Sequence, residues 1–332
     1  MKAVLSKAPG GPSSLVLEEV ADPTPRPREV IVRVAACGVN FPDSLIIEDK
    51  YQIRPPRPFS PGGEVSGVIE SVGAEVEGLK IGQRVLASPG WGGMAEKVAV
   101  SAARVMAIPD AMPFDEAASL LFTYGTTYHA LKDRAHLKPG ESLLVLGAAG
   151  GVGSAAVELG KAMGARVIAA ASTQEKVDSA MAWGADSGFV YPVGPFDKEG
   201  ARKLTDLFKS ACGESGFDVV YDSVGGDYSE AALRAIAWEG RFIVIGFPAG
   251  IARIPLNLPL LKGCDIVGVF WGEFARRNPA ANMANNAELI GLYSAGKIRP
   301  RVSARFPLAR AGEAIALLAE RGALGKVVVT IP

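Results

Sequence analysis

The chain has 332 residues, 48% of them hydrophobic, and its 35 basic residues balance its 35 acidic ones. That length favours two domains over a single core. A net charge of zero with interspersed signs excludes a general electrostatic attraction to nucleic acid or acidic membranes. Only two histidines occur, His129 and His136, which excludes a histidine-rich metal site.

The cysteines and the N-terminus indicate in which cellular compartment the protein is expected. The three cysteines are far apart in the sequence and lack the spacing of metal ligands, so we expect reduced thiols. No apolar run reaches the roughly 20 residues of a membrane-spanning helix, and the first residues do not resemble a signal peptide. We therefore expect a cytoplasmic protein with no membrane partner.

The first 120 residues or so are predicted to be β-rich and irregular. Strand-like segments alternate with Pro- and Gly-rich turns such as P-P-R-P-F-S-P-G-G. The expected strands are Glu29–Ala36, Glu64–Val72, Arg84–Ala87 and Met94–Val100.

Beyond Phe114 the pattern changes to an alternation of strands and helices, which predicts an α/β region with a parallel sheet covered on both faces. The expected strands are Leu143–Leu146, Arg166–Ala171, Gly188–Tyr191, Phe217–Asp222, Arg241–Ile245 and Asp265–Val269. The expected helices are Gly151–Met163, Glu175–Ala182, Lys198–Cys212, Tyr228–Trp238 and about Ala281–Ser294.

A glycine-dense turn, E-S-L-L-V-L-G-A-A-G-G-V-G at Glu141–Gly153, joins the first of these strands to a helix. This strand–turn–helix–strand order is typical of a dinucleotide-binding fold, in which backbone N–H groups and a helix N-terminus contact the pyrophosphate. In the G-x-G-x-x-G pattern the first glycine would fall at Ala148. The candidate contacts are Ala149, Gly150, Gly151, Val152 and Gly153.

The end of the second strand bears on which dinucleotide binds. An NAD site usually has an acid there that binds the ribose 2′-OH, whereas this chain has Ser172 followed by Lys176. A hydroxyl and a cation suit a 2′-phosphate, which favours NADPH. An alternative remains open, because Ser172-x-x-Glu175 is also a capping box and Lys176 could be a solvated lysine.

A set of motifs in the same order along almost the whole chain resembles the zinc-independent quinone oxidoreductases (zeta-crystallin-like) of the medium-chain dehydrogenase/reductase superfamily. The motifs are A-C-G-V-N-F-P-D, K-Y, P-G-G-E-V-S-G-V-I, G-Q-R-V, T-T-Y-H-A-L, G-A-A-G-G-V-G, D-S-V-G-G-D, G-R-F-I-V-I-G-F and G-K-V-V-V-T-I. The resemblance implies a GroES-like β-rich catalytic domain and a doubly wound Rossmann cofactor domain. We expect residues 1–122 to begin the catalytic domain, 123–263 to form the NADPH-binding domain, and 264–332 to close the sheet and complete the catalytic domain.

The resemblance also implies roles for particular residues. Lys176 matches a 2′-phosphate lysine, Ser172 a small phosphate contact, Tyr191 an adenosine-side tyrosine, and Arg321 a C-terminal phosphate-facing arginine. Further cofactor contacts are expected at Gly246, Phe247 and Phe270. Thr126 matches a threonine near the nicotinamide. Polar positions of the catalytic cleft are matched by Asn40, Asp43 and Tyr51.

Departures from the zinc-dependent relatives are informative. Those enzymes place a cysteine at the position of Asn40 and a His-Glu pair at Gly63-Glu64, and no cysteine lies between Cys37 and Cys212 to form a structural zinc lobe. Because zinc needs three or four N, S or O ligands, no metal is expected. The reaction should then be hydride transfer to an acceptor that is already electrophilic, with Tyr51 and Asn40 as candidate hydrogen-bond donors.

Three functions follow from the resemblance. The leading hypothesis is an NADPH:quinone reductase. The second is an enoyl-thioester (acryloyl-CoA-like) or enone reductase acting on an α,β-unsaturated carbonyl, with Tyr51 as proton donor. The third is a non-catalytic NADPH-binding, crystallin-type or RNA-binding protein. By analogy we expect a homodimer that extends the sheet through Asp265–Val269 and Phe270–Gly272; the alternative, an ordinary sheet edge covered by its own chain, stays open.

Overall fold

The computed structural model describes residues 1–320 and 322–332, and it contains two compact units. One unit comprises Met1–Phe122 and Pro300–Pro332, and is called the split unit below. The other, called the central unit, comprises Thr123–Arg299.

The split unit is built on a largely antiparallel 7-stranded sheet with the order β14-β15-β3-β4-β5-β7, in which β6 also pairs with β3. A separate two-stranded sheet joins β1 to β2. The strands are β1 Lys2–Leu5, β2 Val16–Glu19, β3 Glu29–Val39, β4 Glu64–Val72, β5 Arg84–Ala87, β6 Lys97–Ser101, β7 Val105–Ala107, β14 Val302–Pro307 and β15 Lys326–Thr330. The helices are α1 Phe41–Ile47, α2 Phe114–Ala117 and α11 Ala311–Ala319, with 3-10 turns at Pro12–Ser14, Ala102–Arg104 and Leu308–Arg310.

Alternating apolar residues of these strands form the core of the split unit. Val30, Val32 and Val34 of β3 are buried in one hydrophobic cluster with Val327 and Val329 of β15. The strand β15 runs antiparallel to β3 with Val327 opposite Val39. The last strand of the chain is therefore placed beside the residues that lead into α1.

Two expected strands of the split unit differ from the structure at their ends. The strand β3 continues beyond Ala36 to Val39 because β15 pairs with its last residues. The expected strand Met94–Val100 begins only at Lys97, since the Met94 N–H donates instead to the Pro61 carbonyl and Ala95 forms an isolated bridge with Ala3.

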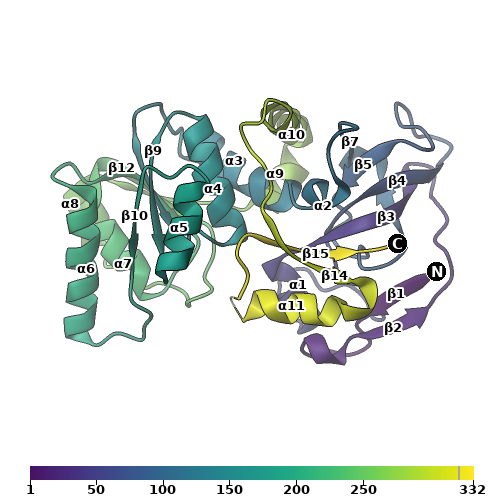
Figure 1. Cartoon of the computed structure of the whole chain (residues 1–332), viewed down its shortest axis with the longest axis horizontal. Helices are drawn as coiled ribbons and strands as arrows, with labels where there is room; N and C mark the ends of the chain where they lie inside the picture. The colour runs from purple at the N-terminus through teal and green to yellow at the C-terminus, as the bar shows by residue number, and fades with distance from the viewer. Residues whose placement is uncertain (321) are drawn as a thin grey trace. The chain divides into compact units, whose positions relative to one another are not determined.

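The central unit contains a 6-stranded parallel sheet with the order β10-β9-β8-β11-β12-β13 (Figure 1). Its strands are β8 Ser142–Leu146, β9 Arg166–Ala171, β10 Ser187–Val190, β11 Phe217–Asp222, β12 Ile236–Val244 and β13 Asp265–Gly268. Its helices are α3 Thr126–Tyr128, α4 Gly151–Ala162, α5 Gln174–Ala182, α6 Lys198–Cys212, α7 Asp227–Arg234, α8 Asn257–Lys262, α9 Trp271–Arg277 and α10 Pro279–Ser294. Wider helical turns occur at Leu121–Gly125 and His129–Arg134.

The strand order confirms the predicted doubly wound sheet. From β8 the chain moves outward through α4, β9, α5 and β10, and from β11 it moves the opposite way through α7, β12, α8 and β13. Helices α4 and α5 lie on one face of the sheet, and α6 and α7 lie on the other (Figure 1). The strand order therefore reverses between β8 and β11, which is where such folds bind their ligands at the carboxyl ends of the strands.

The predicted helix Tyr228–Trp238 is confirmed as far as Arg234 and is wrong beyond it. Helix α7 ends at Arg234, and Ile236 opens β12 in register with Phe217. Ile236 is fully buried, whereas the Trp238 side chain is 69% exposed. Burial of Ile236 beside β11 outweighs the helical pattern of the sequence. None of the helices in the described part of the chain combines the length and apolar character needed to cross a membrane.

Candidate functional site

The glycine turn between β8 and α4 is wound closely enough to require glycine at two positions. Gly147 has a φ of 67°, in the left-handed region, and its carbonyl accepts the Gly150 N–H at 3.0 Å. A Cβ on Gly153 would lie 2.1 Å from the Gly147 carbonyl oxygen. The helix α4 then begins directly after Gly150, so the backbone of Gly151 and Val152 starts a 12-residue helix at the switch point. That geometry suits a pyrophosphate.

The loop after β11 supports this turn from the neighbouring strand. The Asp222 Oδ1 atom accepts the N–H groups of Val224 at 2.8 Å and Gly225 at 2.9 Å. The Ser223 hydroxyl donates to the Leu146 carbonyl at 2.8 Å. Burial raises the pKa of the Asp222 carboxyl above its usual range. The motif D-S-V-G-G thus supports the glycine turn through hydrogen bonds from the neighbouring strand.

At the end of β9, Ser172 and Lys176 lie together, with 3.4 Å between Lys176 Nζ and Ser172 Oγ. The predicted capping box at Ser172 is wrong, because Thr173 is the N-cap of α5 and its Oγ1 accepts the Lys176 N–H at 3.3 Å. The Ser172 hydroxyl is therefore available to pair with the lysine side chain. No acidic residue precedes the helix at this position.

The other predicted cofactor residues of the central unit follow the carboxyl ends of neighbouring strands. Tyr191 comes directly after β10, is buried, and packs its ring 4.9 Å from that of Tyr228. Gly246 and Phe247 come after β12, Phe270 comes after β13, and both phenylalanine side chains are exposed. The predicted contact Arg321 lies outside the described residues.

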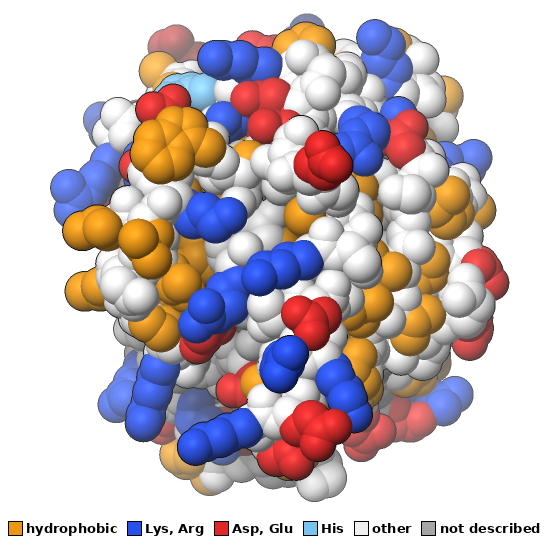
Figure 2. Space-filling view, turned by 90° about the vertical axis from the view of Figure 1, so that its left-hand side faces the viewer, with side chains coloured by type: hydrophobic (Ala, Val, Ile, Leu, Met, Phe, Trp, Pro, Cys, Tyr) orange, Lys and Arg blue, Asp and Glu red, His pale blue; other side chains and the backbone are white. Residues whose placement is uncertain are grey.

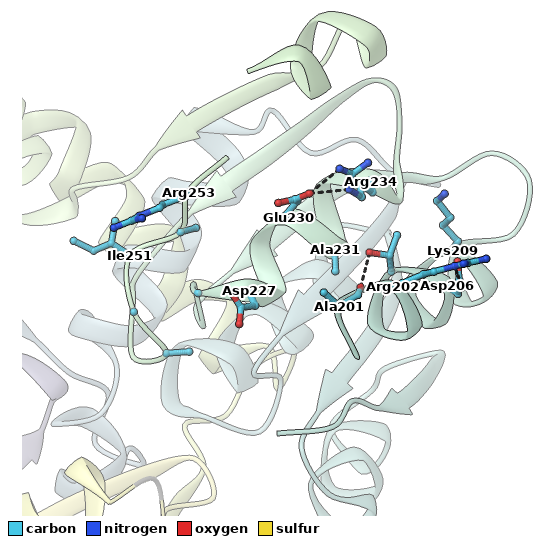
Figure 3. Close-up of a pocket in the computed structure, with 15 residues that line it drawn as sticks. Ala201, Arg202, Asp206, Lys209, Asp227, Glu230, Ala231, Arg234, Ile251 and Arg253 are labelled. Carbon is cyan, nitrogen blue, oxygen red and sulfur yellow. Dashed lines mark hydrogen bonds and ion pairs between the residues drawn. The ribbon is translucent and has the colours of Figure 1, made fainter. Parts of the chain in front are cut away.

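A groove of about 700 Å³ lies elsewhere on the central unit, between α6, α7 and the loop after β12 (Figure 3). It contains none of the predicted cofactor residues. Of its lining residues, Arg234 is paired with Glu230, with 2.7 Å between Nη2 and Oε1. The groove is therefore distinct from the glycine turn and the Ser172–Lys176 pair.

In the split unit, the carboxyl end of β3 carries a buried polar cluster. The Asn40 N–H donates to Asp43 Oδ2 at 2.7 Å, and the Asn40 Nδ2 donates to Glu64 Oε2 at 3.1 Å. The Lys326 Nζ of β15 donates to Asn40 Oδ1 at 2.6 Å. Glu64 and Lys326 were absent from the predicted site. The sequence does contain a signal for both residues, because each is a charged residue within an otherwise apolar, glycine-containing motif: the acid of G-G-E and the lysine of G-K-V-V-V.

The electrostatics of this cluster act on Asp43 and Tyr51. Burial raises the pKa of the Asp43 carboxyl to about 6, against the N–H groups of Asn40 and Gly62 and the Lys326 charge, which lower it. Burial, and secondarily the Asp43 charge, raises the pKa of the Tyr51 phenol. Tyr51 packs against the core of the split unit, and among the described residues its hydroxyl has no hydrogen-bond partner.

The predicted site residues fall into both units. Asn40, Asp43 and Tyr51 are brought together in the split unit. Thr126 is half-buried at the start of α3 in the central unit. No group of three or more His, Cys, Asp and Glu side chains in the described part of the chain is arranged to hold a metal ion.

Comparison with known proteins agrees with this architecture. Residues 26–110 match the alcohol dehydrogenase GroES-like domain, and residues 151–286 match the family described as zinc-binding dehydrogenase. The chain is 38% identical to quinone oxidoreductase-like protein 2 of Bos taurus, over 96% of this chain and 89% of that protein.

Solved structures are similar over nearly the full length. The quinone oxidoreductase of Escherichia coli complexed with NADPH has a TM-score of 0.88 at 28% identity, covering 99% of this chain and 100% of that one. The quinone oxidoreductase of Thermus thermophilus, solved alone and with NADPH, has a TM-score of 0.82 at 34% identity, with the same two coverages. The chain belongs to the quinone oxidoreductase family of the medium-chain dehydrogenase/reductase superfamily.

Proposed function

We propose that this protein is an NADPH-dependent reductase that transfers a hydride to a quinone without the help of zinc. The observation that carries the proposal is the Ser172–Lys176 pair at the end of β9, where an NAD site would place an acid. A hydroxyl and an ammonium group suit a 2′-phosphate. Two similar solved structures are quinone oxidoreductases that hold NADPH.

The residues of the central unit fit NADPH. The backbone at Gly150–Gly153 would receive the pyrophosphate, since it forms the N-terminus of α4 at the point where the strand order reverses. Ser172 and Lys176 would hold the 2′-phosphate, and Tyr191 would lie on the adenosine side. Gly246, Phe247, Phe270 and Thr126 are proposed contacts farther along the cofactor. When bound, NADPH would supply the hydride.

The donor set of the split unit supports a reaction without zinc. Where zinc-dependent relatives place their ligands, this chain has Asn40, Gly63 and Glu64. The Asn40 and Glu64 side chains already contact the Lys326 ammonium, and Gly63 has no side chain. A tetrahedral zinc site needs more donors than remain.

We assign Tyr51 as the group that meets the acceptor oxygen. The raised pKa of its phenol keeps the proton in place at neutral pH. A protonated hydroxyl can donate a hydrogen bond to the oxyanion that forms as the acceptor is reduced. The nearby Asp43 carboxylate disfavours a tyrosinate and so favours this donor role.

Steady-state assays test the proposal. With NADPH, kcat/KM for 1,4-naphthoquinone should exceed that for crotonyl-CoA and acryloyl-CoA, and NADH should be a poorer donor. Treatment with a chelator should leave the rate unchanged. A much higher kcat/KM for the thioesters would assign the enzyme to the enoyl-thioester reductases, in which Tyr51 would protonate the α-carbon.

We also propose a homodimer in which two copies pair along β13. This strand is at the edge of the central sheet and pairs only with β12 among the described strands. Large apolar side chains that are 41% to 80% exposed occur on β13, at position 238 of β12 and in residues 251–261. They are Trp238, Ile251, Leu256, Leu260, Leu261 and Ile266. In the space-filling view of Figure 2, hydrophobic side chains form groups toward the left and the right sides, with mixed Lys, Arg, Asp and Glu between them. An unpaired edge with apolar flanks is suited to a second copy.

Light scattering on the wild type and on Leu260→Glu tests this interface. The wild type should have the mass of two chains, and the variant should dissociate toward one. A monomeric wild type would contradict the dimer without affecting the proposed reaction.

A further inference from the structure

Lys326, the first residue of β15, is a lysine buried in the interior of the split unit, with only 3% of its surface exposed. Its Nζ atom lies 3.2 Å from the Val39 carbonyl oxygen, 2.6 Å from Asn40 Oδ1 and 3.3 Å from Glu64 Oε2. Three oxygen acceptors for three ammonium hydrogens satisfy the group completely. Glu64 is fully buried.

Such a pair is poorly explained by stability alone. Removing two charges from water is expensive, and apolar residues of similar size often stabilise a protein as well or better. The same unit contains a large apolar cluster, against which apolar side chains at positions 64 and 326 could have packed. A buried ion pair that touches a predicted site residue calls for another explanation.

The contacts of Lys326 dictate how the Asn40 amide points. Because Oδ1 accepts from Nζ, the amide nitrogen must face the other way, toward Glu64 Oε2 at 3.1 Å and the Gly38 carbonyl at 3.3 Å. Both amide hydrogens are then engaged within the protein. Asn40, Lys326 and Glu64 thus form a closed ring of three contacts. Asn40 has no amide hydrogen left for the substrate, so Tyr51 is the remaining candidate donor.

The ring is connected to the start of α1 and to the chain after α2. The Asn40 N–H donates to Asp43 Oδ2 at 2.7 Å, while Asp43 Oδ1 accepts the Gly62 N–H at 3.1 Å. The other Glu64 oxygen accepts the Phe122 N–H at 2.9 Å. The charged and titratable groups that face Asp43 are Lys326, Glu64, Cys37 and Tyr51.

We propose that Lys326 is a positioning residue for the reduction: through Asn40 and Glu64 it holds the start of α1, and with it Asp43, in the arrangement under which Tyr51 meets the acceptor. This inference rests on the proposed function. Lys326 touches none of the predicted cofactor contacts that the structure describes, and it acts on the reaction only through its neighbours.

The test compares Lys326→Met with the double variant Lys326→Met/Glu64→Gln. The single variant leaves a buried carboxylate unpaired and is the one at risk of not folding. The double variant removes both charges, and its Tm should stay close to that of the wild type. The double variant should lower kcat for naphthoquinone by at least about tenfold while leaving KM for NADPH within about twofold, because the cofactor contacts are elsewhere.

A matched control removes another ion pair of the same unit, Arg305–Asp115, which is more exposed and has 2.5 Å between Nη2 and Oδ2. The double variant Arg305→Met/Asp115→Asn should keep the wild-type kcat. Lys326→Arg retains the charge and donors and should recover part of the activity.

Hydrogen–deuterium exchange of peptides covering residues 40–51 provides a readout independent of quinone reduction. Exchange should be faster in Lys326→Met/Glu64→Gln than in the wild type and unchanged in the control. A double variant with wild-type kcat, or with wild-type exchange in these peptides, would overturn the positioning role. If the wild type reduces no quinone, the proposed function fails, and the exchange experiment still decides whether Lys326 orders this segment.

Discussion

The two units of this chain assemble their polar groups in different ways. In the central unit, the glycine turn and the Ser172–Lys176 pair follow two consecutive strands of one parallel sheet. In the split unit, Lys326 contacts Asn40 across 286 positions of sequence. The first arrangement follows from local order along the chain, and the second depends on how the C-terminal strand pairs with β3.

The units also differ in where the charge lies. The Ser172–Lys176 pair is half-buried, and the proposed function has the two side chains exchange this contact for contacts with a phosphate. The Asn40–Glu64–Lys326 ring is buried, and the Asp43 carboxyl beside it has a pKa raised to about 6. We therefore expect changes in the central unit to act mainly on cofactor affinity, and changes in the split unit to act on turnover and on pH dependence.

The largest expected effect is the loss of stability when a side chain is added to the glycine turn of the central unit, compared with the same substitution at an open helical position. Gly153→Ala should lower the free energy of unfolding by about 3 kcal/mol and abolish tight NADPH binding, because the new Cβ would lie 2.1 Å from the Gly147 carbonyl oxygen. Gly291→Ala is the matched control, since this helical glycine has open space around its Cβ position and should gain up to about 1 kcal/mol. Urea denaturation and NADPH fluorescence titration measure both. Equal stability of the two variants would contradict the close packing of the turn.

The next effect tests the assignment of the 2′-phosphate. Lys176→Ala should weaken NADPH binding by about 10- to 100-fold and leave NADH binding nearly unchanged, because only NADPH has the phosphate. Lys203→Ala, at an exposed position of helix α6, should change neither affinity. Titration calorimetry with both cofactors gives the ratio. If Lys176→Ala weakened NADH binding as much as NADPH binding, Lys176 would not be a contact of the 2′-phosphate.

The pH dependence of stability tests the buried carboxyl of the split unit. The pKa of Asp43 is raised from 3.8 to about 6, so the folded state binds a proton that the unfolded state releases in this range. Asp43 alone should therefore increase the free energy of unfolding by about 1.4 kcal/mol as the pH falls from about 7.5 to about 5. Denaturant titrations of the wild type and Asp43→Asn at the two pH values should show this gain only in the wild type. If the free energy of unfolding changed with pH equally in the wild type and in Asp43→Asn, the raised pKa of Asp43 would be refuted.

The smallest expected effect separates the cap of α5 from the phosphate contact beside it. Thr173→Ala should cost about 1 kcal/mol of stability, because its Oγ1 accepts the Lys176 N–H. Ser172→Ala should leave stability nearly unchanged and weaken NADPH binding instead. Thermal melts and cofactor titrations of the two variants distinguish these roles. Reversed outcomes would restore the capping box that the sequence suggested.

Sequence patterns predicted the parallel sheet well, because buried apolar strands alternate with helices and each pattern is local. They failed where tertiary pairing overrides a local preference. Residues 236–238 extend a helical pattern but belong to β12, since Ile236 is buried opposite Phe217. Met94 resembles a strand residue, but its N–H donates to the carbonyl of Pro61, which lies in a distant segment of the chain. In both cases a distant segment decides the local conformation.

The sequence by itself determined the glycine turn, the absence of an acid after β9 and the residue types Asn40 and Gly63 on which the proposed reaction without zinc depends, because each is a matter of residue type at one position. Only the tertiary structure decided what Glu64 and Lys326 do. Strand pairing between β3, β4 and β15 brings their opposite charges together beside Asn40, and no pattern within one segment specifies that pairing. A buried charge needs a partner, and the fold supplies it from the far end of the chain.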